Sequence, residues 1–280
     1  MITKSSTRNS LDSMESKITG KDIICISSMP YGEMWTRKQR LMTIFAEMGN
    51  KVLYVEPVES IFASHGNQDS LKPSFKEIKK NLYVLHPGGR LPFARFGFIR
   101  DMNLKRYANT VKEYAGKLDF HKPVMFTYLP VIHAHSPFEQ LRDYFDISLL
   151  IYDCVDEHSE TIGYTSEAAE IVHNWDLDLT KKADLTFVTA RGLYEDRKHL
   201  SDDIYFSPNG ADIKHFSKAL DDSTEIPSDI AEIPEPRIGF VGSMSDWIDY
   251  DLIAEIAKSY PKSSVVLVGP VKGGMKPGIL

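Results

Sequence analysis

The chain alternates between short apolar runs and longer amphipathic segments. Apolar runs that are rich in β-branched residues and bounded by turn residues predict buried strands. These runs lie at 22–30, 51–57, 81–87, 123–130, 148–155, 184–190 and 204–208. Helical periodicity predicts helices at 34–48, capped by Gly49, and at 100–118. The alternation indicates an α/β fold, namely a Rossmann-like, doubly wound parallel sheet with helices on both faces.

Two stretches of this region are polar and carry no strong periodicity. Residues 1–20 are rich in serine and contain no apolar stretch typical of a signal peptide, so we expect a disordered tail. Residues 60–80 are predicted to form a polar loop. The first domain is therefore expected to span 21–216.

The pattern changes after residue 216. Residues 217–236 are acidic and rich in proline, which is typical of a linker between domains. A new βαβ pattern follows, with strands at 237–241 and 264–268 and a helix at 250–260. Two strands and one helix make a marginal fold, so we expect 237–280 to be part of a second Rossmann-like domain. The alternative is that this unit packs onto the first sheet as an appendage.

The amino-acid composition limits the classes of function that this protein can have. The 280 residues include 33 Lys and Arg against 39 Asp and Glu, a net charge of −6, which argues against broad nucleic-acid binding. Hydrophobic residues make up 42% and charged residues 26%, which is ordinary for a globular protein. No apolar stretch is long enough to span a membrane. Cys25 and Cys154 both fall inside predicted strands, so we expect buried, inert thiols and a cytoplasmic protein.

Ligands of doubly wound sheets bind beyond the carboxyl ends of the strands, so the residues there are candidates. After the first strand come Trp35 and Arg37, without the glycine pattern of a dinucleotide site. Arg37, in the first turn of a helix, could bind an acceptor or a phosphate, or be an ordinary surface arginine. After the strand at 148–155 come Asp153 and Asp156, which could orient sugar hydroxyls or act as a general base. Alternatively, Asp156 caps the next helix and Asp153 forms a local pair.

His133 and His135 are two residues apart, so on a helix they would point to different faces. Because the sequence has no neighbouring cluster of metal ligands, we expect no metal site, although one of the two could face a cleft.

The segment Arg90–Arg106 combines five cations with phenylalanines. The cations are Arg90, Arg95, Arg100, Lys105 and Arg106, and the aromatic residues are Phe93, Phe96 and Phe98. In an acidic protein, such a basic–aromatic segment could rest on an anionic membrane surface. The alternative is an ordinary loop whose phenylalanines tuck into the core.

Two turns flank the predicted linker. The segment Ser207–Asp212 contains the tight-turn pair Asn209-Gly210 and lies where a hinge would face a cleft. Beyond the linker, Gly242-Ser243 follows the first strand of the second unit. Such a small-residue turn lets a phosphate approach backbone N–H groups.

Four segments together resemble a known family. The segment SPNGADIKHF resembles the hinge that closes the N-terminal domain of family-four-like glycosyltransferases of the GT-B fold. The stretch from Arg237 to Pro270 looks like the start of their nucleotide-sugar-binding domain. WTRKQRLMTIFAEMGNKVLYVEP and LLIYDCVDEHSE resemble a bacterial subgroup that makes teichuronic acid and exopolysaccharides. The resemblance covers roughly residues 22–270.

The resemblance implies transfer of a sugar from a nucleotide-sugar donor to a cell-surface polysaccharide or a lipid-linked acceptor, with no metal or other cofactor. The protein would work in the cytoplasm, at the inner face of the membrane through Arg90–Arg106. Gly242, Ser243 and Gly269 would contact the donor. The implied acceptor or cleft residues are Trp35, Arg37, His133, Asn209 and Asp212, and the implied catalytic residues are Asp153 and Asp156.

The sequence departs from the family in one respect. The family carries a basic pair and a Glu-x7-Glu motif later in the C-terminal domain, and neither occurs before Leu280. Without those cations a leaving diphosphate loses transition-state stabilisation, so we expect this chain to be weakly active or inactive. The alternative function is a non-catalytic relative that binds an acceptor or a partner protein. A nucleotide-sugar epimerase is a third hypothesis, disfavoured by the hinge segment.

Overall fold

The computed structural model describes residues 18–32, 35–58, 72–132, 136–160, 165–245 and 247–271. The chain divides into two compact units, Met1–Gly210 and Ala211–Leu280.

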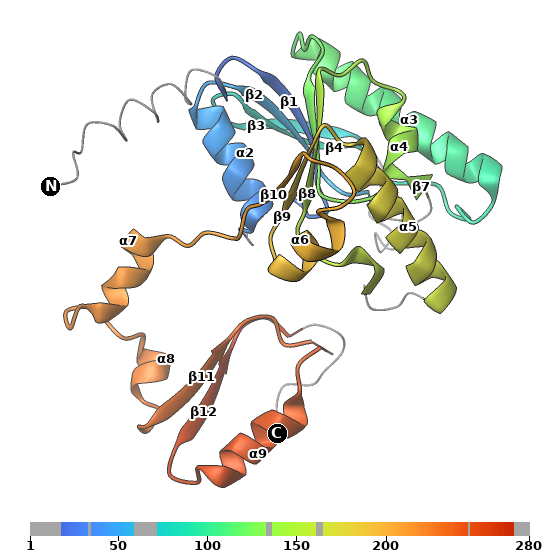
Figure 1. Ribbon diagram of the computed structural model, residues 1–280. Coiled ribbons are helices and arrows are strands. Elements are labelled where there is room, and N and C mark those ends of the chain that lie inside the picture. Colours follow the sequence, from blue (N-terminus) through green and yellow to red (C-terminus); the bar gives the residue numbers. More distant parts are fainter. Residues whose placement is uncertain are drawn as a thin grey trace, which may run out of the picture. The chain divides into compact units, whose positions relative to one another are not determined.

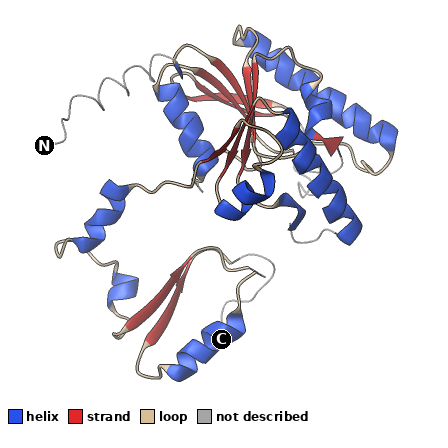
Figure 2. Cartoon of the chain, viewed as in Figure 1, coloured by secondary structure: helices blue, strands red, loops and turns tan. Residues whose placement is uncertain are grey.

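The described part of the first unit is built on one eight-stranded sheet (Figures 1 and 2). Its strands are β1 (Asp22–Ile26), β2 (Lys51–Val55), β3 (Ser74–Lys79), β4 (Leu82–His86), β5 (Val124–Thr127), β8 (Leu149–Cys154), β9 (Leu185–Val188) and β10 (Ile204–Phe206). The order across the sheet is β10-β9-β8-β5-β1-β2-β4-β3, and only β3 pairs in the antiparallel sense. The predicted doubly wound α/β sheet is thereby confirmed.

The chain changes direction across the sheet beside β1. From β1 it moves outward through β2 to β4, and then it returns to β5, on the other side of β1. The connections that follow β1 and β5 therefore run to opposite sides of the sheet. The carboxyl ends of these two strands form a topological switch point, where ligands of such sheets bind.

Helices cover both faces of this sheet. They are α2 (Arg37–Glu47), α3 (Gly97–Lys117), α4 (Phe138–Arg142), α5 (Ser166–Lys182) and α6 (Arg191–Arg197). Side chains of α3 to α6, including Leu104, Phe138 and Leu179, join one buried cluster, whereas Met42 and Ala46 of α2 join the cluster on the opposite face. Beside α2 this second face also holds an open apolar groove of about 410 Å³.

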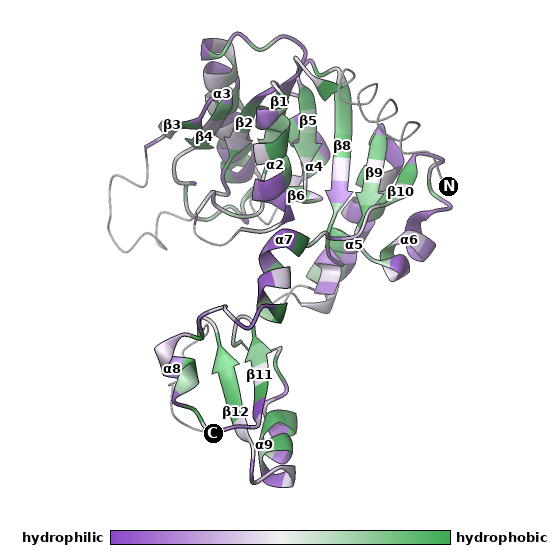
Figure 3. Cartoon of the chain, turned by 90° about the vertical axis from the view of Figure 1, so that its left-hand side faces the viewer, coloured by the Kyte–Doolittle hydropathy of each residue, from purple (hydrophilic) through white to green (hydrophobic). Residues whose placement is uncertain are grey.

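The central strands are buried on both faces, and Figure 3 shows that they are mostly hydrophobic. The two cysteines lie there as fully buried free thiols, as predicted. Burial raises the pKa of Cys154 to about 12 and that of Cys25 further, so neither is a nucleophile near neutral pH.

Strand β3 corrects the prediction of a polar loop over 60–80. Residues 74–79 pair with β4 at the sheet edge, with a register irregularity between Glu77 and Lys79. Five of the six residues of β3 are exposed, which explains why no apolar run marked the strand. Lysine-rich, irregular edge strands resist pairing with other chains, so an edge position does not need apolar side chains.

A short antiparallel pair and a 3-10 turn complete the described part of the first unit. The pair consists of β6 (Val131–Ile132) and β7 (Ser136–Pro137), and the turn is His158–Glu160. None of the helices described is both long and apolar enough to cross a membrane.

The second unit contains a parallel pair of strands. Its elements are α7 (Ile213–Phe216), a 3-10 turn (Ser217–Leu220), α8 (Ser228–Ala231), β11 (Arg237–Val241), α9 (Tyr250–Ser259) and β12 (Ser264–Val268). β11 and β12, which are connected by α9, pair in parallel and form the predicted βαβ unit. The pairing continues beyond both strands, because Met244 N–H donates to the Pro270 carbonyl at 2.9 Å.

A buried ionic network holds the segment after β8 to helices α5 and α6. The guanidinium of Arg197 is fully buried and donates to Asp176, also fully buried, at 3.1 Å and to Glu157 at 2.8 Å. Burial disfavours the Glu157 carboxylate, but hydrogen bonds from Arg197 and Ser159 outweigh it and lower the pKa of Glu157 to about 2.

We predict that Arg197→Met destabilises the protein by about 3–5 kcal/mol, because Asp176 is left as an unpaired buried charge. Urea denaturation followed by circular dichroism measures this. The matched control is Lys198→Met, which removes a cation paired with Glu195 on the surface, and it should leave the free energy of unfolding nearly unchanged. Equal losses in the two variants would contradict the assignment of a stabilising buried network.

Candidate functional site

The loop after β1 is pinned at the switch point by two hydroxyl groups. The Ser27 Oγ and Tyr54 hydroxyl oxygens lie 2.6 Å apart, and they lie 2.9 and 2.8 Å from the Met29 carbonyl oxygen, so their two protons serve two of these three contacts. Ser27 and Tyr54 are both buried. The backbone after β1 therefore has a fixed path across the carboxyl edge of the sheet.

The same loop is tied to the start of α2. Gln39 donates from Nε2 to the Pro30 carbonyl at 3.0 Å and accepts from the Thr36 N–H at 3.0 Å. Tyr31 donates its N–H to Glu56 at 2.8 Å. Because Gln39 is fully buried, these bonds set the position of the first turn of α2 beside the switch point.

The first turn of α2 carries two cations, Arg37 and Lys38, and no acid. The N-terminus of a helix already has a partial positive charge, so this placement disfavours the helix. Both side chains are largely buried: the Arg37 side chain is 14% exposed, and Lys38 is 7% exposed. The local structure thus concentrates positive charge where an anionic ligand would be stabilised.

Arg37 joins three elements of the first unit. Its Nε donates to Asp153 Oδ2 at 2.8 Å, one terminal nitrogen donates to Ser207 Oγ at 3.0 Å, and the other to the Pro208 carbonyl at 3.2 Å. Asp153 lies on β8, and Ser207 follows β10. One guanidinium therefore connects α2 to both strands at the carboxyl edge.

Asp153 is a fully buried carboxylate near the end of β8, where Figure 3 shows that strand turning hydrophilic. Burial raises the pKa of Asp153, while the hydrogen bond and charge of Arg37 act in the opposite direction. Its Oδ2 atom is occupied by Arg37, and Oδ1 has no hydrogen-bond partner within the described residues. Asp153 is thus a partner of Arg37 with one oxygen still able to accept.

Lys38 lies over the ring of Tyr128, with Nζ 5.3 Å from the ring centre. Burial lowers the pKa of Lys38, and the charges of Asp156 and Asp153 oppose that shift. Because burial has the larger effect, this ammonium loses its proton more readily than a solvated lysine, although the ring face and the two carboxylates favour its charged form.

Asp156 is exposed just beyond β8. Its charge also acts on His158, whose pKa is lowered mainly by burial. The backbone carbonyl of Asp156 accepts from the Cys154 thiol at 3.5 Å. Of the two predicted catalytic carboxylates, Asp153 is therefore buried and ion-paired, whereas Asp156 is open to solvent.

The other predicted acceptor residues differ in what surrounds them. Trp35 is 46% exposed and meets the Tyr31 ring edge-to-face, with 5.8 Å between ring centres. Asn209 is exposed, and Asp212 caps α7 by accepting from the His215 N–H at 3.0 Å. His133 lies outside the described residues.

The predicted donor turn of the second unit is closely packed. Gly242 donates its N–H to the Val268 carbonyl at 3.0 Å. A Cβ on Gly269, whose φ is +149°, would lie 1.9 Å from the Gly242 carbonyl oxygen, so only glycine fits there. The Ser243 hydroxyl is buried without a hydrogen-bond partner among the residues described. The turn therefore offers an unused hydroxyl beside tightly packed backbone.

The structure brings together Arg37, Asp153 and the Ser207 end of the hinge segment, which are far apart in the sequence. Sequence reasoning did not select Lys38, Tyr128 or the Arg197 network. Lys38 could have been found, because two adjacent cations at a helix N-terminus oppose the helix dipole. Nothing in the local sequence marks Tyr128 as its partner, since that contact depends on the packing of β5 beside β1.

A comparison with protein-family models and one with curated proteins find no match to this chain. Solved structures do match. Sucrose-phosphate synthase from Thermosynechococcus elongatus aligns with a TM-score of 0.55 at 16% identity, over 90% of this chain and 71% of that chain. The catalytic domain of starch synthase IV from Arabidopsis thaliana, bound to ADP and acarbose, aligns with a TM-score of 0.53 at 10% identity, over 90% and 69%.

HepE from Anabaena, in complex with UDP and glucose, aligns with a TM-score of 0.51 at 13% identity, over 90% of this chain and 62% of that chain. These neighbours are glycosyltransferases of the GT-B fold. At such low identities the likeness establishes the fold, and the chain has the GT-B-like α/β architecture predicted from its sequence.

We predict that Arg37→Met makes stability depend on pH through Asp153. Unpaired and buried, Asp153 would have a folded pKa further above its unfolded value. The protonated Asp153 then stabilises the folded state fully at a pH below the pKa of the unfolded state. This stabilisation is lost as the pH rises through the pKa that Asp153 has in the folded state. The variant should lie near the wild type at pH 4 and lose about 3–5 kcal/mol by pH 7, measured by urea denaturation at each pH.

The control for this experiment is the double variant Arg37→Met/Asp153→Asn. It removes the titrating group and should show little of the added pH dependence. If the single and double variants have the same pH profile, the ion pair is not what stabilises Asp153.

Proposed function

We propose that this chain takes part in transfer of a sugar from a nucleotide-sugar donor to an acceptor hydroxyl. The observation that carries the proposal is the pair of cations Arg37 and Lys38 at the start of α2, held beside the carboxylates of Asp153 and Asp156. In glycosyl transfer, negative charge develops on the leaving diphosphate and on the acceptor oxygen. A fixed, buried positive region is suited to stabilising such charge. The GT-B-like fold supports this class of reaction by analogy.

We assign donor contact to the turns around Gly242, Ser243 and Gly269. The close packing of Gly269 against Gly242 keeps side chains out of this turn, and the Ser243 hydroxyl has no hydrogen-bond partner among the described residues. A diphosphate binds such turns through N–H and O–H donors. The neighbours bound to ADP or to UDP and glucose lend support by analogy.

We assign acceptor contact to the carboxyl edge of the first unit. The exposed face of Trp35 offers a stacking surface for a sugar ring, and His133 and Asn209 are proposed to contribute to binding the acceptor. Asp212, the cap of α7, is proposed as a hinge residue. The acceptor class proposed is a cell-surface polysaccharide or a lipid-linked glycan.

The proposed reaction breaks the bond between the anomeric carbon and the diphosphate oxygen, and forms a bond from that carbon to the acceptor oxygen. Asp156, open to solvent, is proposed to accept the hydroxyl proton. Asp153 is proposed to act with it by holding the Arg37 guanidinium toward the developing charge. This scheme uses side chains alone, with no metal or cofactor.

We predict that one nucleotide sugar from a panel of UDP, GDP and ADP sugars binds the full chain, measured by isothermal titration calorimetry. Ser243→Ala should weaken that binding about tenfold, because a charge-assisted hydrogen bond is lost. The matched control is Ser228→Ala, an exposed serine of the same unit, which should bind like the wild type.

The transfer step is tested separately by product formation from the donor that binds. Arg37→Gln should lower the rate at least tenfold with donor affinity unchanged. If no nucleotide sugar binds, donor use is refuted. Donor binding without turnover would instead support the alternative of a non-catalytic binding subunit.

The basic–aromatic segment Arg90–Arg106 is proposed to touch the membrane. Phe93, Phe96 and Phe98 are 57%, 48% and 72% exposed, so the alternative that they tuck into the core is wrong. The Arg95 guanidinium lies 5.0 Å from the Phe96 ring centre. Exposed rings beside cations suit the headgroup region of an anionic bilayer, where a lipid-linked acceptor would be found.

We predict that the double variant Phe96→Ser/Phe98→Ser binds vesicles of phosphatidylglycerol and phosphatidylcholine at least tenfold more weakly than the wild type in co-sedimentation, since it loses buried apolar area. The control, Ile44→Ser/Ile171→Ser, removes two exposed apolar side chains from other helices and should bind normally. Equal binding to pure phosphatidylcholine vesicles would contradict the electrostatic part of the proposal.

A further inference from the structure

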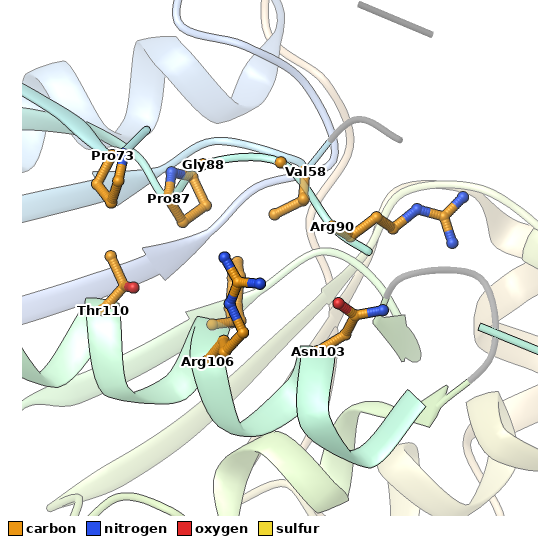
Figure 4. Close-up of a pocket in the computed structure, with 10 residues that line it drawn as sticks. Val58, Pro73, Pro87, Gly88, Arg90, Asn103, Arg106 and Thr110 are labelled. Atoms are coloured by element: carbon orange, nitrogen blue, oxygen red, sulfur yellow. The ribbon is translucent and has the colours of Figure 1, made fainter. Parts of the chain in front are cut away.

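A small cavity opens at the carboxyl end of β4, between the loop Pro87–Arg90 and helix α3 (Figure 4). Its volume is about 50 Å³. One water-sized probe needs roughly 10–15 Å³, so the cavity holds a group of a few heavy atoms. In the sheet order β1-β2-β4, two strand spacings separate this cavity from the β1 edge, roughly 10 Å. The cavity is therefore distinct from the Arg37 site.

The loop that forms one wall is held rigidly. The buried side chain of Asn103 accepts from the Leu91 N–H at 2.8 Å and donates to the Leu91 carbonyl at 3.0 Å. This two-bond clamp fixes the end of the loop to α3. Gly88 has φ +86°, a left-handed conformation that glycine adopts without strain. The wall is thus preorganised, which lowers the entropic cost of binding.

The groups that face the cavity are donors. Figure 4 shows the Arg106 side chain rising from α3 toward Pro87 and Gly88, with the Thr110 hydroxyl on the same side of the helix. The described residues that line the cavity include no acid, and none of the described residues forms an ion pair with Arg106. The N–H groups of Gly88 and Gly89 make no backbone hydrogen bond with any described residue. Arg90 also lines the cavity, although Figure 4 shows that its guanidinium is directed away from Arg106.

We propose that this cavity binds a phosphate monoester. The guanidinium of Arg106 can donate two parallel hydrogen bonds to phosphate oxygens. The Thr110 hydroxyl and the N–H groups of Gly88 and Gly89 can serve the remaining oxygens, as backbone amides do in other phosphate sites. The phosphate comes either from a soluble molecule or from a lipid headgroup, since the cavity adjoins the basic–aromatic segment.

The test uses the full-length chain without any nucleotide sugar, so its result does not depend on glycosyl transfer. The probes are inorganic phosphate and glycerol 3-phosphate, with binding followed by phosphorus NMR line broadening. We expect saturable binding by the wild type and at least tenfold weaker binding by Arg106→Gln. Arg106→Lys should restore part of the affinity, and Thr110→Val should weaken it about threefold. Each variant is first checked for an unchanged circular dichroism spectrum.

The matched control is Lys105→Gln, which removes the neighbouring exposed cation on α3 and should bind like the wild type. Two results would overturn the proposal: no saturable binding by the wild type, or equal losses in Arg106→Gln and Lys105→Gln, which would indicate only general surface charge. A competition arm then identifies the source. Displacement of bound phosphate by phosphatidylcholine vesicles containing phosphatidic acid, beyond that by phosphatidylcholine alone, supports a lipid headgroup. Displacement by glycerol 3-phosphate alone supports a soluble monoester.

Discussion

The ion pair between Arg37 and Asp153 is the interaction on which the carboxyl edge of the first unit depends. A fully buried carboxylate is unfavourable without a partner, and Arg37 is the group that supplies one. The same guanidinium also reaches the Ser207 hydroxyl and the Pro208 carbonyl. One side chain therefore ties the first turn of α2 to β8 and to the segment after β10. Because these elements lie on both sides of the switch point, the pair sets the geometry of the whole edge.

This arrangement places two cations at a helix N-terminus. Arg37 is paired with Asp153, whereas Lys38 lies over the Tyr128 ring, with the charges of Asp156 and Asp153 acting on it. Two cations here oppose the helix dipole and lower helix stability, so folding alone does not favour them. A function in which these two cations stabilise a negative charge explains why they are placed there. The Arg197 network differs in this respect, because its cation is matched by two carboxylates and serves to fix the loop after β8.

In both units, glycine residues follow the carboxyl ends of strands. In the second unit, Gly269 packs so closely on Gly242 that no other residue fits. In the first unit, Gly88 and Gly89 line a small cavity, and Asn103 clamps the end of their loop at Leu91. Parallel strands end at one edge of a sheet, so backbone donors gather there, and arginine or serine side chains add to them. The GT-B-like fold thus offers several anion-binding places with different partners.

The sequence by itself determined the α/β class, the positions of the central strands, the βαβ pattern of the second unit and the burial of both cysteines. These follow from local apolar periodicity, which burial on both faces of a parallel sheet makes strong. It missed β3, because an edge strand with exposed lysines has no such signal. It selected Arg37 and Asp153 separately, yet only the tertiary structure paired them, 116 residues apart in the sequence. Likewise, the ring beneath Lys38 and the clamp of Asn103 on Leu91 depend on how strands and helices pack. Side-chain partners across a sheet edge are set by strand order, and strand order is not encoded in any local pattern.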